Sequence, residues 1–222
     1  MKVLAIGAVT GLLLLSPTVS HAQDTPPNPI TENACVIELG VANRYGVTGT
    51  TGFLGTMLGG GLLGALAVDA ANKDGNEKRK TELMEVLSPE YIKSVFIQTD
   101  LVSRIKSDAL QINYYDLPDD KKIVNTMIKS SKPQSQNSRP CYYDVLIRDI
   151  LLIRHISQSN LEVRFTVKKF VGQDMISSKS DIISAPTSAF PAKDPAKQSE
   201  ASNRVKESFK VTVKKLVEKR FN

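Results

Sequence analysis

Two cysteines are the residues of this chain whose chemistry is easiest to predict. Cys35 and Cys141 are the only cysteines among its 222 residues. In an oxidising compartment, an isolated pair of cysteines most simply forms a disulfide bond. Two free buried thiols or a metal-binding pair are the alternatives, but a metal site needs histidine ligands nearby, and His155 is the only histidine beyond residue 22. We therefore predict a disulfide bond between Cys35 and Cys141.

No other set of residues has the composition of a catalytic centre. Cys141 and His155 stand fourteen residues apart along one segment with the composition of a strand, which is too far for a nucleophile–base pair. The acidic residues are more simply explained as turn residues and solvated strand positions: Asp119, Asp120, Asp144 and Asp149. We therefore expect a protein that is not an enzyme and that binds no cofactor or metal.

An uncharged stretch of 22 residues, Val47–Val68, contains seven glycines. Its eight strongly apolar side chains favour membrane insertion by roughly 0.3–0.6 kcal/mol each, whereas each glycine disfavours a helix by up to about 1 kcal/mol, so the two sums nearly cancel. The three consecutive glycines do not predict a phosphate-binding loop, because no Lys-Ser/Thr follows them. Five glycines have the spacing that lets two backbones pack closely, alone or in a homo-oligomer: Gly52, Gly55, Gly59, Gly60 and Gly64.

The possible roles of this stretch differ in whether its two ends lie in the same compartment. If the strand before it pairs with later strands, both ends of the stretch lie in one compartment, which a single membrane crossing forbids. A disulfide between Cys35 and Cys141 would impose the same condition. We therefore expect residues 46–69 to form a glycine-rich helix or loop insertion that does not span a membrane. A membrane span and a self-associating glycine zipper are the alternatives.

Four segments have the composition of strands. Residues 35–45 and 109–117 mix β-branched and apolar side chains over one strand length. Residues 141–156 are apolar on both residue parities, which is typical of a strand buried on both faces at the centre of a sheet. Residues 161–171 alternate apolar and polar side chains after a polar turn, which predicts an antiparallel strand with one face in water.

Two segments have the pattern of amphipathic helices. Ser88, Pro89 and Glu90 form a favourable helix start, and apolar residues then recur every three or four positions through residue 106. A second helix is predicted for residues 200–222, with a narrow apolar stripe. Its basic side chains could dock on an anionic membrane or a peptidoglycan surface, although an ordinary surface helix is the simpler interpretation. These side chains are Lys206, Lys210, Lys214, Lys215 and Lys219.

These elements predict an α+β fold with one main domain. A mainly antiparallel sheet of three to four strands would be covered by the helices at residues 89–106 and 200–222, and residues 35–171 would form the core. Residues 172–199 are rich in Pro, Ser and Lys. We therefore expect a loop over residues 172–199, with at most one short edge strand.

Residues 1–22 have the features of a cleaved signal peptide: a charged start at Lys2, an apolar core, and a small-x-small site that ends at Ala22. The Pro-rich residues 23–34 would then form a flexible leader. Cleavage leaves 200 residues with 28 Lys and Arg against 23 Asp and Glu, a net charge of +5. This charge is too weak to indicate nucleic-acid binding. We expect a periplasmic or secreted protein, with membrane association as the alternative.

The order of these elements resembles small exported bacterial proteins whose domain is built like the N-terminal domain of TolB. The resemblance covers about residues 35–171 plus the last helix and includes the hairpin YYDVLIRDILLIRHI and NLEVRFTVKKF. Activators of penicillin-binding proteins and the curli-pore lipoproteins belong to this group, which implies a protein that binds other envelope components. No cysteine follows the expected cleavage site, so the chain departs from the lipoprotein members. We therefore expect an accessory protein of the bacterial cell envelope with an envelope protein as its partner.

Overall fold

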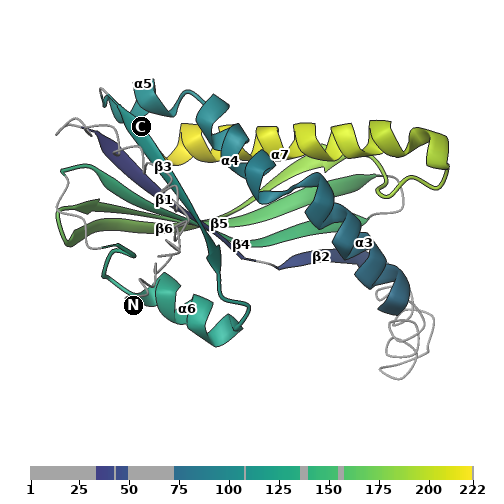
Figure 1. The fold of residues 1–222 in the computed structure, drawn as a ribbon, viewed down its shortest axis with the longest axis horizontal. Coiled ribbons are helices and arrows are strands. Elements are labelled where there is room, and N and C mark those ends of the chain that lie inside the picture. Colours follow the sequence, from purple (N-terminus) through teal and green to yellow (C-terminus); the bar gives the residue numbers. More distant parts are fainter. Residues whose placement is uncertain are drawn as a thin grey trace, which may run out of the picture. The chain divides into compact units, whose positions relative to one another are not determined.

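Six strands form one sheet in the computed structural model (Figure 1). The structure describes residues 34–42, 44–49, 73–107, 109–135, 140–154 and 158–221. The strands are β1 (Cys35–Ala42), β2 (Tyr45–Gly49), β3 (Leu110–Leu117), β4 (Tyr142–Arg154), β5 (Ser159–Val171) and β6 (Asp174–Thr187). The helices are α3 (Lys73–Val86), α4 (Pro89–Gln98), α5 (Leu101–Ile105), α6 (Lys121–Lys129) and α7 (Gln198–Arg220), with a 3₁₀ turn, η1, at Pro195–Lys197. The predicted α+β class is confirmed.

Both strand directions occur in the sheet. Its order is β3-β1-β4-β5-β6, and β2 pairs with the second half of β4. β1 runs parallel to β3 and β4, whereas β5 runs antiparallel to β4 and β6. The prediction of a mainly antiparallel sheet of three to four strands therefore holds only in part: β4, β5 and β6 are antiparallel, but the sheet has six strands and mixed directions. The central position predicted for residues 141–156 is confirmed, since β4 lies between β1 and β5.

β1 and β2 replace the single strand predicted for residues 35–45. β1 pairs with β4 as far as Ile147, and β2 pairs with it from Ile150 onward. A β-bulge at Arg148 separates the two ladders. Because a bulge adds one residue to a strand, it changes the parity that faces the core. Val145 and Ile147 before the bulge, and Ile150 and Leu152 after it, all belong to the main core.

Helices cover both faces of the sheet (Figure 1). α3, α4 and α7 lie over the main core, where Phe96, Phe165 and Phe209 are fully buried. α6 lies on the opposite face, where Val124 packs with Leu146 of β4. The described residues thus contain more helices than the two that the sequence predicted to cover the sheet.

The helix predicted for residues 89–106 is two helices. α4 starts as expected, with the Ser88 Oγ accepting a hydrogen bond from the N–H of Tyr91 at 3.3 Å. It ends where Thr99 adopts an extended conformation, with ψ at 150°. α5 then begins at Leu101, which is fully buried. The apolar spacing continues across the break because both helices pack on the same core, so the spacing did not reveal it.

The structure differs most from expectation within residues 172–199. β6 occupies 14 of them and pairs with β5 over its whole length. It is an edge strand, and only Asp181, Ile183 and Ala185 are buried along it. An edge strand needs few apolar side chains, and polar ones protect its free edge from other chains. The Ser and Lys content that suggested a loop belongs to such a strand.

The helix predicted for residues 200–222 is present as α7. Its buried side chains recur every three or four residues, as the pattern predicted. Ser208 Oγ donates to the Pro186 carbonyl at 2.6 Å. The buried carboxylate of Asp181 on β6 accepts hydrogen bonds from Lys219 at 2.6 Å and from Arg220 Nη2 at 2.7 Å. These bonds attach α7 to the edge strand.

Candidate functional site

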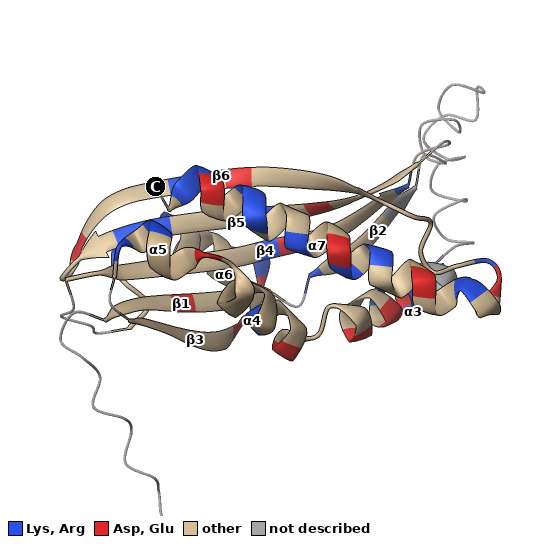
Figure 2. Cartoon of the chain, turned by 90° about the horizontal axis from the view of Figure 1, so that it is seen from above, with Lys and Arg blue, Asp and Glu red and all other residues tan. Residues whose placement is uncertain are grey.

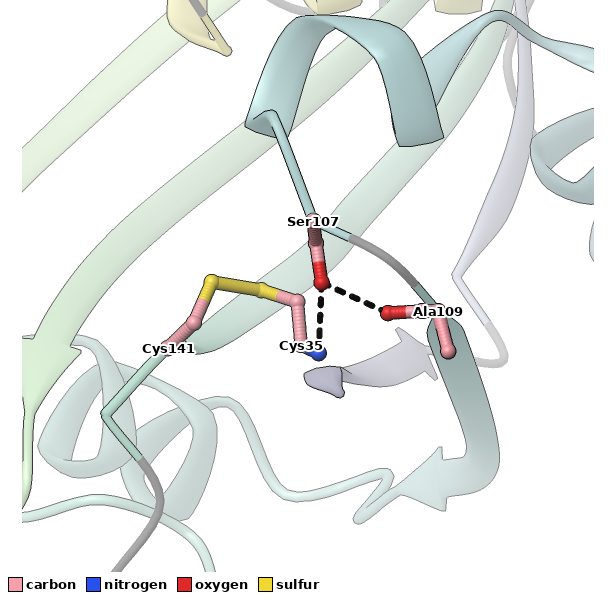
Figure 3. The surroundings of a disulfide bond; sticks show 4 residues. All are labelled: Cys35, Ser107, Ala109 and Cys141. Carbon is pink, nitrogen blue, oxygen red and sulfur yellow. Dashed lines mark hydrogen bonds between the residues drawn. A yellow bond between two sulfur atoms is a disulfide. The ribbon is translucent and has the colours of Figure 1, made fainter. Parts of the chain in front are cut away.

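The predicted disulfide bond is present and joins the starts of two neighbouring parallel strands (Figure 3). Cys35 opens β1 and Cys141 precedes β4, with their Cα atoms 4.7 Å apart. The N–H of Cys35 also donates to the carbonyl of Ala109 at 2.9 Å. It donates as well to Ser107 Oγ at 3.1 Å, and this hydroxyl donates to the carbonyl of Ala109 at 2.7 Å, which holds the start of β3 at the same point (Figure 3). A cross-link that closes a loop of about 100 residues stabilises a fold by about 4–5 kcal/mol in the chain-entropy model. The bond therefore stabilises the parallel part of the sheet.

Most of the five lysines predicted to form a basic surface contact other residues of this chain. Lys206 Nζ lies 5.3 Å from the ring centre of Tyr91, Lys210 pairs with Glu207 at 2.7 Å, Lys215 donates to the Ser184 carbonyl at 3.2 Å, and Lys219 pairs with Asp181 at 2.6 Å. Of the five, only the Lys214 side chain has none of these contacts with the described residues. Three acidic side chains stand among the seven basic ones of α7 (Figure 2). Docking on an anionic surface stays a prediction.

The five glycines predicted to pack closely lie outside the described residues: Gly52, Gly55, Gly59, Gly60 and Gly64. The described chain stops at Gly49 in β2 and resumes at Lys73 in α3, and α3 lies against β2. Both ends of the intervening segment therefore belong to one packed unit. No described helix is long and apolar enough to cross a membrane. Glycine-mediated packing stays a prediction.

Asp144 lies in a buried polar cluster and not at the solvated position predicted from the sequence. Its side chain is fully buried on the α6 face of the sheet, and its Oδ1 accepts a hydrogen bond from the Tyr142 hydroxyl at 2.7 Å. Lys168 on β5 is equally buried and donates to the carbonyls of Ser130 at 2.7 Å and Met127 at 2.5 Å. These carbonyls form the carboxyl end of α6, where a positive charge is favourable. The cluster therefore attaches α6 to the sheet.

The titration of this cluster is strongly altered by its surroundings. Burial raises the pKa of Asp144 to about 6, against the opposing effects of Tyr142 and Lys168. Burial also lowers the pKa of Lys168. A carboxyl group with a pKa near neutrality is a candidate acid or base. Because Asp144 is 0% exposed, however, no substrate can touch it in this structure, and we assign the cluster a structural role.

The carboxyl ends of β1 and β3 border an open crevice. After β1 the chain continues through β2 to α3 on the main-core face, whereas after β3 it turns at Pro118 to α6 on the opposite face (Figure 1). Where neighbouring parallel strands send their connections to opposite faces, a crevice forms outside their carboxyl ends, and ligands of open α/β sheets bind at such points. The pair β3 and β1 forms a point of this kind.

We call this cavity the carboxyl-end crevice; its volume is about 530 Å³. Its polar lining consists of Tyr45, Tyr114, Asp116 and Asp119, and its apolar lining includes Val41, Met84 and Leu117. An adjoining cavity of about 400 Å³ shares Tyr45 and Asp119 with it. Both volumes lie within the usual range for sites that hold small ligands.

The two tyrosines of the crevice are hydrogen-bonded and hold their protons firmly. Tyr114 donates to Asp116 Oδ1 at 3.0 Å, and Tyr45 donates to the carbonyl of Leu87 at 2.9 Å. Burial, together with the charge of Asp116, raises the pKa of Tyr45 to about 12. Burial and the hydrogen bond to Asp116 raise the pKa of Tyr114 as well. At neutral pH both phenols are therefore donors and aromatic surfaces, and neither is a base.

The charged side chains that line the crevice are acids without counterions. Neither Asp116 nor Asp119 forms an ion pair with a cation among the described residues. The cations of the adjoining cavity pair with other acids: Arg44 pairs with Asp149 of the same cavity at 3.0 Å, and Lys80 pairs with Glu77 at 3.9 Å. The crevice thus has a local negative charge.

Sequence reasoning identified only Asp119 among these residues, and only as a turn residue. Tyr45, Tyr114 and Asp116 were not candidates, because their proximity depends on the parallel pairing of β1 with β3. In the register of these strands Val41 lies opposite Asp116, so the ends of both strands coincide. An antiparallel pair would have placed the two carboxyl ends at opposite edges of the sheet. His155, which the sequence also considered, lies outside the described residues.

The chain matches no family model and no curated protein. Two solved structures resemble it in part. One is a Xanthomonas campestris protein of the DUF330 family, with 10% identity, 86% of each chain covered and a TM-score of 0.35. The other is a Helicobacter pylori protein described as a candidate homologue of a neuraminyllactose-binding hemagglutinin, with 10% identity, 86% of this chain and 84% of that chain covered, and a TM-score of 0.33. Similarities at this level carry no argument about function, and the resemblance to TolB-like proteins stays a prediction.

Proposed function

We propose that this protein is an exported, non-enzymatic binding protein of the bacterial cell envelope that holds part of its partner in the carboxyl-end crevice. The crevice itself carries this proposal: it is an open cavity of about 530 Å³ with aromatic and acidic lining, at the point of the sheet where ligands bind in related architectures. Its phenols keep their protons at neutral pH. A group that acts as a general base needs a pKa near the working pH, so this lining suits recognition better than acid–base chemistry.

Two further features support export to the envelope. A disulfide bond between Cys35 and Cys141 is stable in an oxidising compartment such as the periplasm and rare in the cytosol. Residues 1–22 have the pattern of a cleaved signal peptide. The resemblance of the sequence to TolB-like envelope proteins agrees with this proposal, and we propose an envelope protein as the partner.

Cross-linking in intact cells tests this proposal. A photoreactive residue replaces Lys80, which lines the adjoining cavity and has a side chain 35% exposed, in a chain expressed with its own residues 1–22. The same residue at Asp174 in β6 is the control, because Asp174 is exposed and lies at the opposite end of the strands. We expect one discrete product with an envelope component from position 80 and none from position 174, and a mature chain that begins at Gln23. Equal products at both positions, or a cytoplasmic chain that keeps residues 1–22, would overturn the proposal.

The alternative function is a membrane-anchored or self-associating protein that uses residues 47–68. It receives less support, because β2 and α3, which flank most of this stretch, lie against each other in one unit. Carbonate extraction of the membrane fraction separates the two functions. Release of the mature chain into the supernatant is expected; retention in the pellet would favour the membrane-anchored alternative.

A further inference from the structure

We propose that the carboxyl-end crevice binds an organic cation, specifically an ammonium group attached to alkyl carbon. This inference rests on the proposed binding function and adds the chemical class of the bound group. Three properties of the crevice support it: an uncompensated negative charge, two tyrosine rings, and apolar walls.

The charge of the crevice is opposite to that of the whole chain. The chain has 29 Lys and Arg against 23 Asp and Glu, a net charge of +6. Both charged residues that line the crevice are nevertheless acidic, and neither Asp116 nor Asp119 has a cation partner among the described residues. The nearby Arg44 and Lys80 pair with other acids. A cationic ligand would supply the counterion that the fold does not provide.

The position of Asp116 suits this role. Its Oδ1 accepts the hydrogen bond of the Tyr114 hydroxyl at 3.0 Å, which fixes the orientation of the carboxylate. No described residue bonds to its Oδ2. Asp119 follows two residues after the end of β3 and lines both cavities. Two carboxylates therefore border the space in which a positive group would lie.

The aromatic and apolar lining favours an organic cation over a bare ion. Tyr45 and Tyr114 line the crevice, and tyrosine rings attract ammonium groups. Val41 and Met84 supply apolar walls, which would remove water from a bare metal ion without replacing its ligands. The methyl or methylene groups of an organic ammonium ion do not hold water in this way, so apolar walls can contact them without that loss. An anion would be repelled by both carboxylates, and a neutral ligand would leave them without a counterion.

Binding of choline to the disulfide-bonded mature chain tests the inference. The matched ligand is 3,3-dimethyl-1-butanol, which has the shape of choline with carbon in place of the charged nitrogen. n-Butylammonium is a third ligand, because it represents primary amines such as lysine side chains, whereas choline represents quaternary head groups. Dissociation constants are measured by calorimetry and by ligand-observed NMR. The double variant Asp116→Asn/Asp119→Asn removes the charge of the crevice.

The charge-matched control variant is Asp100→Asn/Asp174→Asn, which removes two exposed carboxylates elsewhere. All four acids are exposed, so the variants should fold like the wild type, which circular dichroism and thermal melts verify. We expect at least one of the two ammonium ligands to bind about tenfold more tightly than the neutral alcohol. Its affinity should fall about tenfold in the crevice variant and stay unchanged in the control variant. Whichever ammonium ligand binds more tightly identifies the source, a quaternary head group or a primary amine.

Equal binding of choline, n-butylammonium and the alcohol, no saturable binding of either cation, or equal losses in both variants would overturn the inference. The cross-linking experiment separates a failure of this inference from a failure of the proposed binding function. If the product at position 80 persists in the Asp116→Asn/Asp119→Asn chain and in excess choline, the crevice binds a partner by other chemistry. If that product is absent from the wild type, the binding function itself fails.

Discussion

The buried carboxyl group of Asp144 should make the stability of this protein depend on pH. Its pKa is about 6 in the folded protein, against an ordinary value of 3.8, and burial is the main cause. Because the folded state favours the protonated form, the stabilisation is complete below about pH 3.8 and is lost as the pH rises through about 6. The folded protein should therefore become more stable on mild acidification, which is opposite to the usual behaviour of a native carboxylate.

The size of the effect follows from the two pKa values. A difference of about two units corresponds to about 3 kcal/mol between the fully protonated and fully ionised limits. Linkage then gives a gain of about 1.5 kcal/mol in the free energy of unfolding between about pH 7.5 and about pH 5. The variant Asp144→Asn should lose this gain, because its amide does not titrate. Its amide oxygen can still accept the hydrogen bond of the Tyr142 hydroxyl.

Urea denaturation of both chains at several pH values between these limits measures the effect. The relevant quantity is the difference in unfolding free energy between wild type and Asp144→Asn, since contributions of other titrating groups cancel in it. Asp181 does not interfere, because the hydrogen bonds from Arg220 and Lys219 hold its pKa at about 2, below the window. Asp174→Asn, an exposed substitution, is the control and should follow the wild type.

Parallel stability curves for the wild type and Asp144→Asn would refute the reasoning. They would mean that Asp144 titrates alike in the folded and unfolded chains, so that burial does not control its pKa. An opposite slope, with the wild type losing stability on acidification relative to Asp144→Asn, would mean that the charge of Lys168 outweighs burial.

Three further predictions concern the disulfide, a close backbone contact and the edge of the sheet. Replacing Cys35 and Cys141 by Ser should lower the free energy of unfolding in urea by about 4–5 kcal/mol, and a reducing agent should do the same to the wild type. Gly40→Ala would place a Cβ 2.6 Å from the ring of Tyr115 and should cost about 1–3 kcal/mol in the same assay; an unchanged midpoint would mean that the ring moves freely. The ionised carboxylate of Asp181, with its lowered pKa of about 2, stabilises the fold above about pH 3.8, and this stabilisation is lost as the pH falls to about 2. Asp181→Asn should therefore remove the part of acid denaturation that occurs in this range. Thermal melts in acid that matched for both chains would contradict this.

The composition of β4 shows how far the sequence could predict the fold. Apolar residues at both parities of residues 141–156 correctly predicted a central strand. Part of that pattern has a second cause, since the bulge at Arg148 exchanges the parities that face the core. Periodicity alone cannot separate burial on both faces from a change of register. The break between β1 and β2 opposite the bulge was therefore hidden.

Tertiary contacts decided the other differences. Nothing local distinguishes a polar edge strand such as β6 from a loop, because its partner β5 supplies the hydrogen bonds that order it. Asp144 has the same adjacent sequence whether it faces water or α6. The docking of α6, with the carbonyls of Met127 and Ser130 on Lys168, covers that face.

The parallel arrangement that creates the carboxyl-end crevice was implied by one pair of correct predictions. Cys35 lies at the start of the first predicted strand and Cys141 at the start of the central one. A disulfide bond between them places both starts at the same edge of the sheet, and two neighbouring strands that leave one edge together must run parallel. A parallel pair requires a crossover connection through helices, which directs attention to its carboxyl ends. The disulfide and the crevice are therefore linked: the bond fixes the direction of β1, and this direction brings the end of β1 beside the end of β3, where Tyr114 and Asp116 lie.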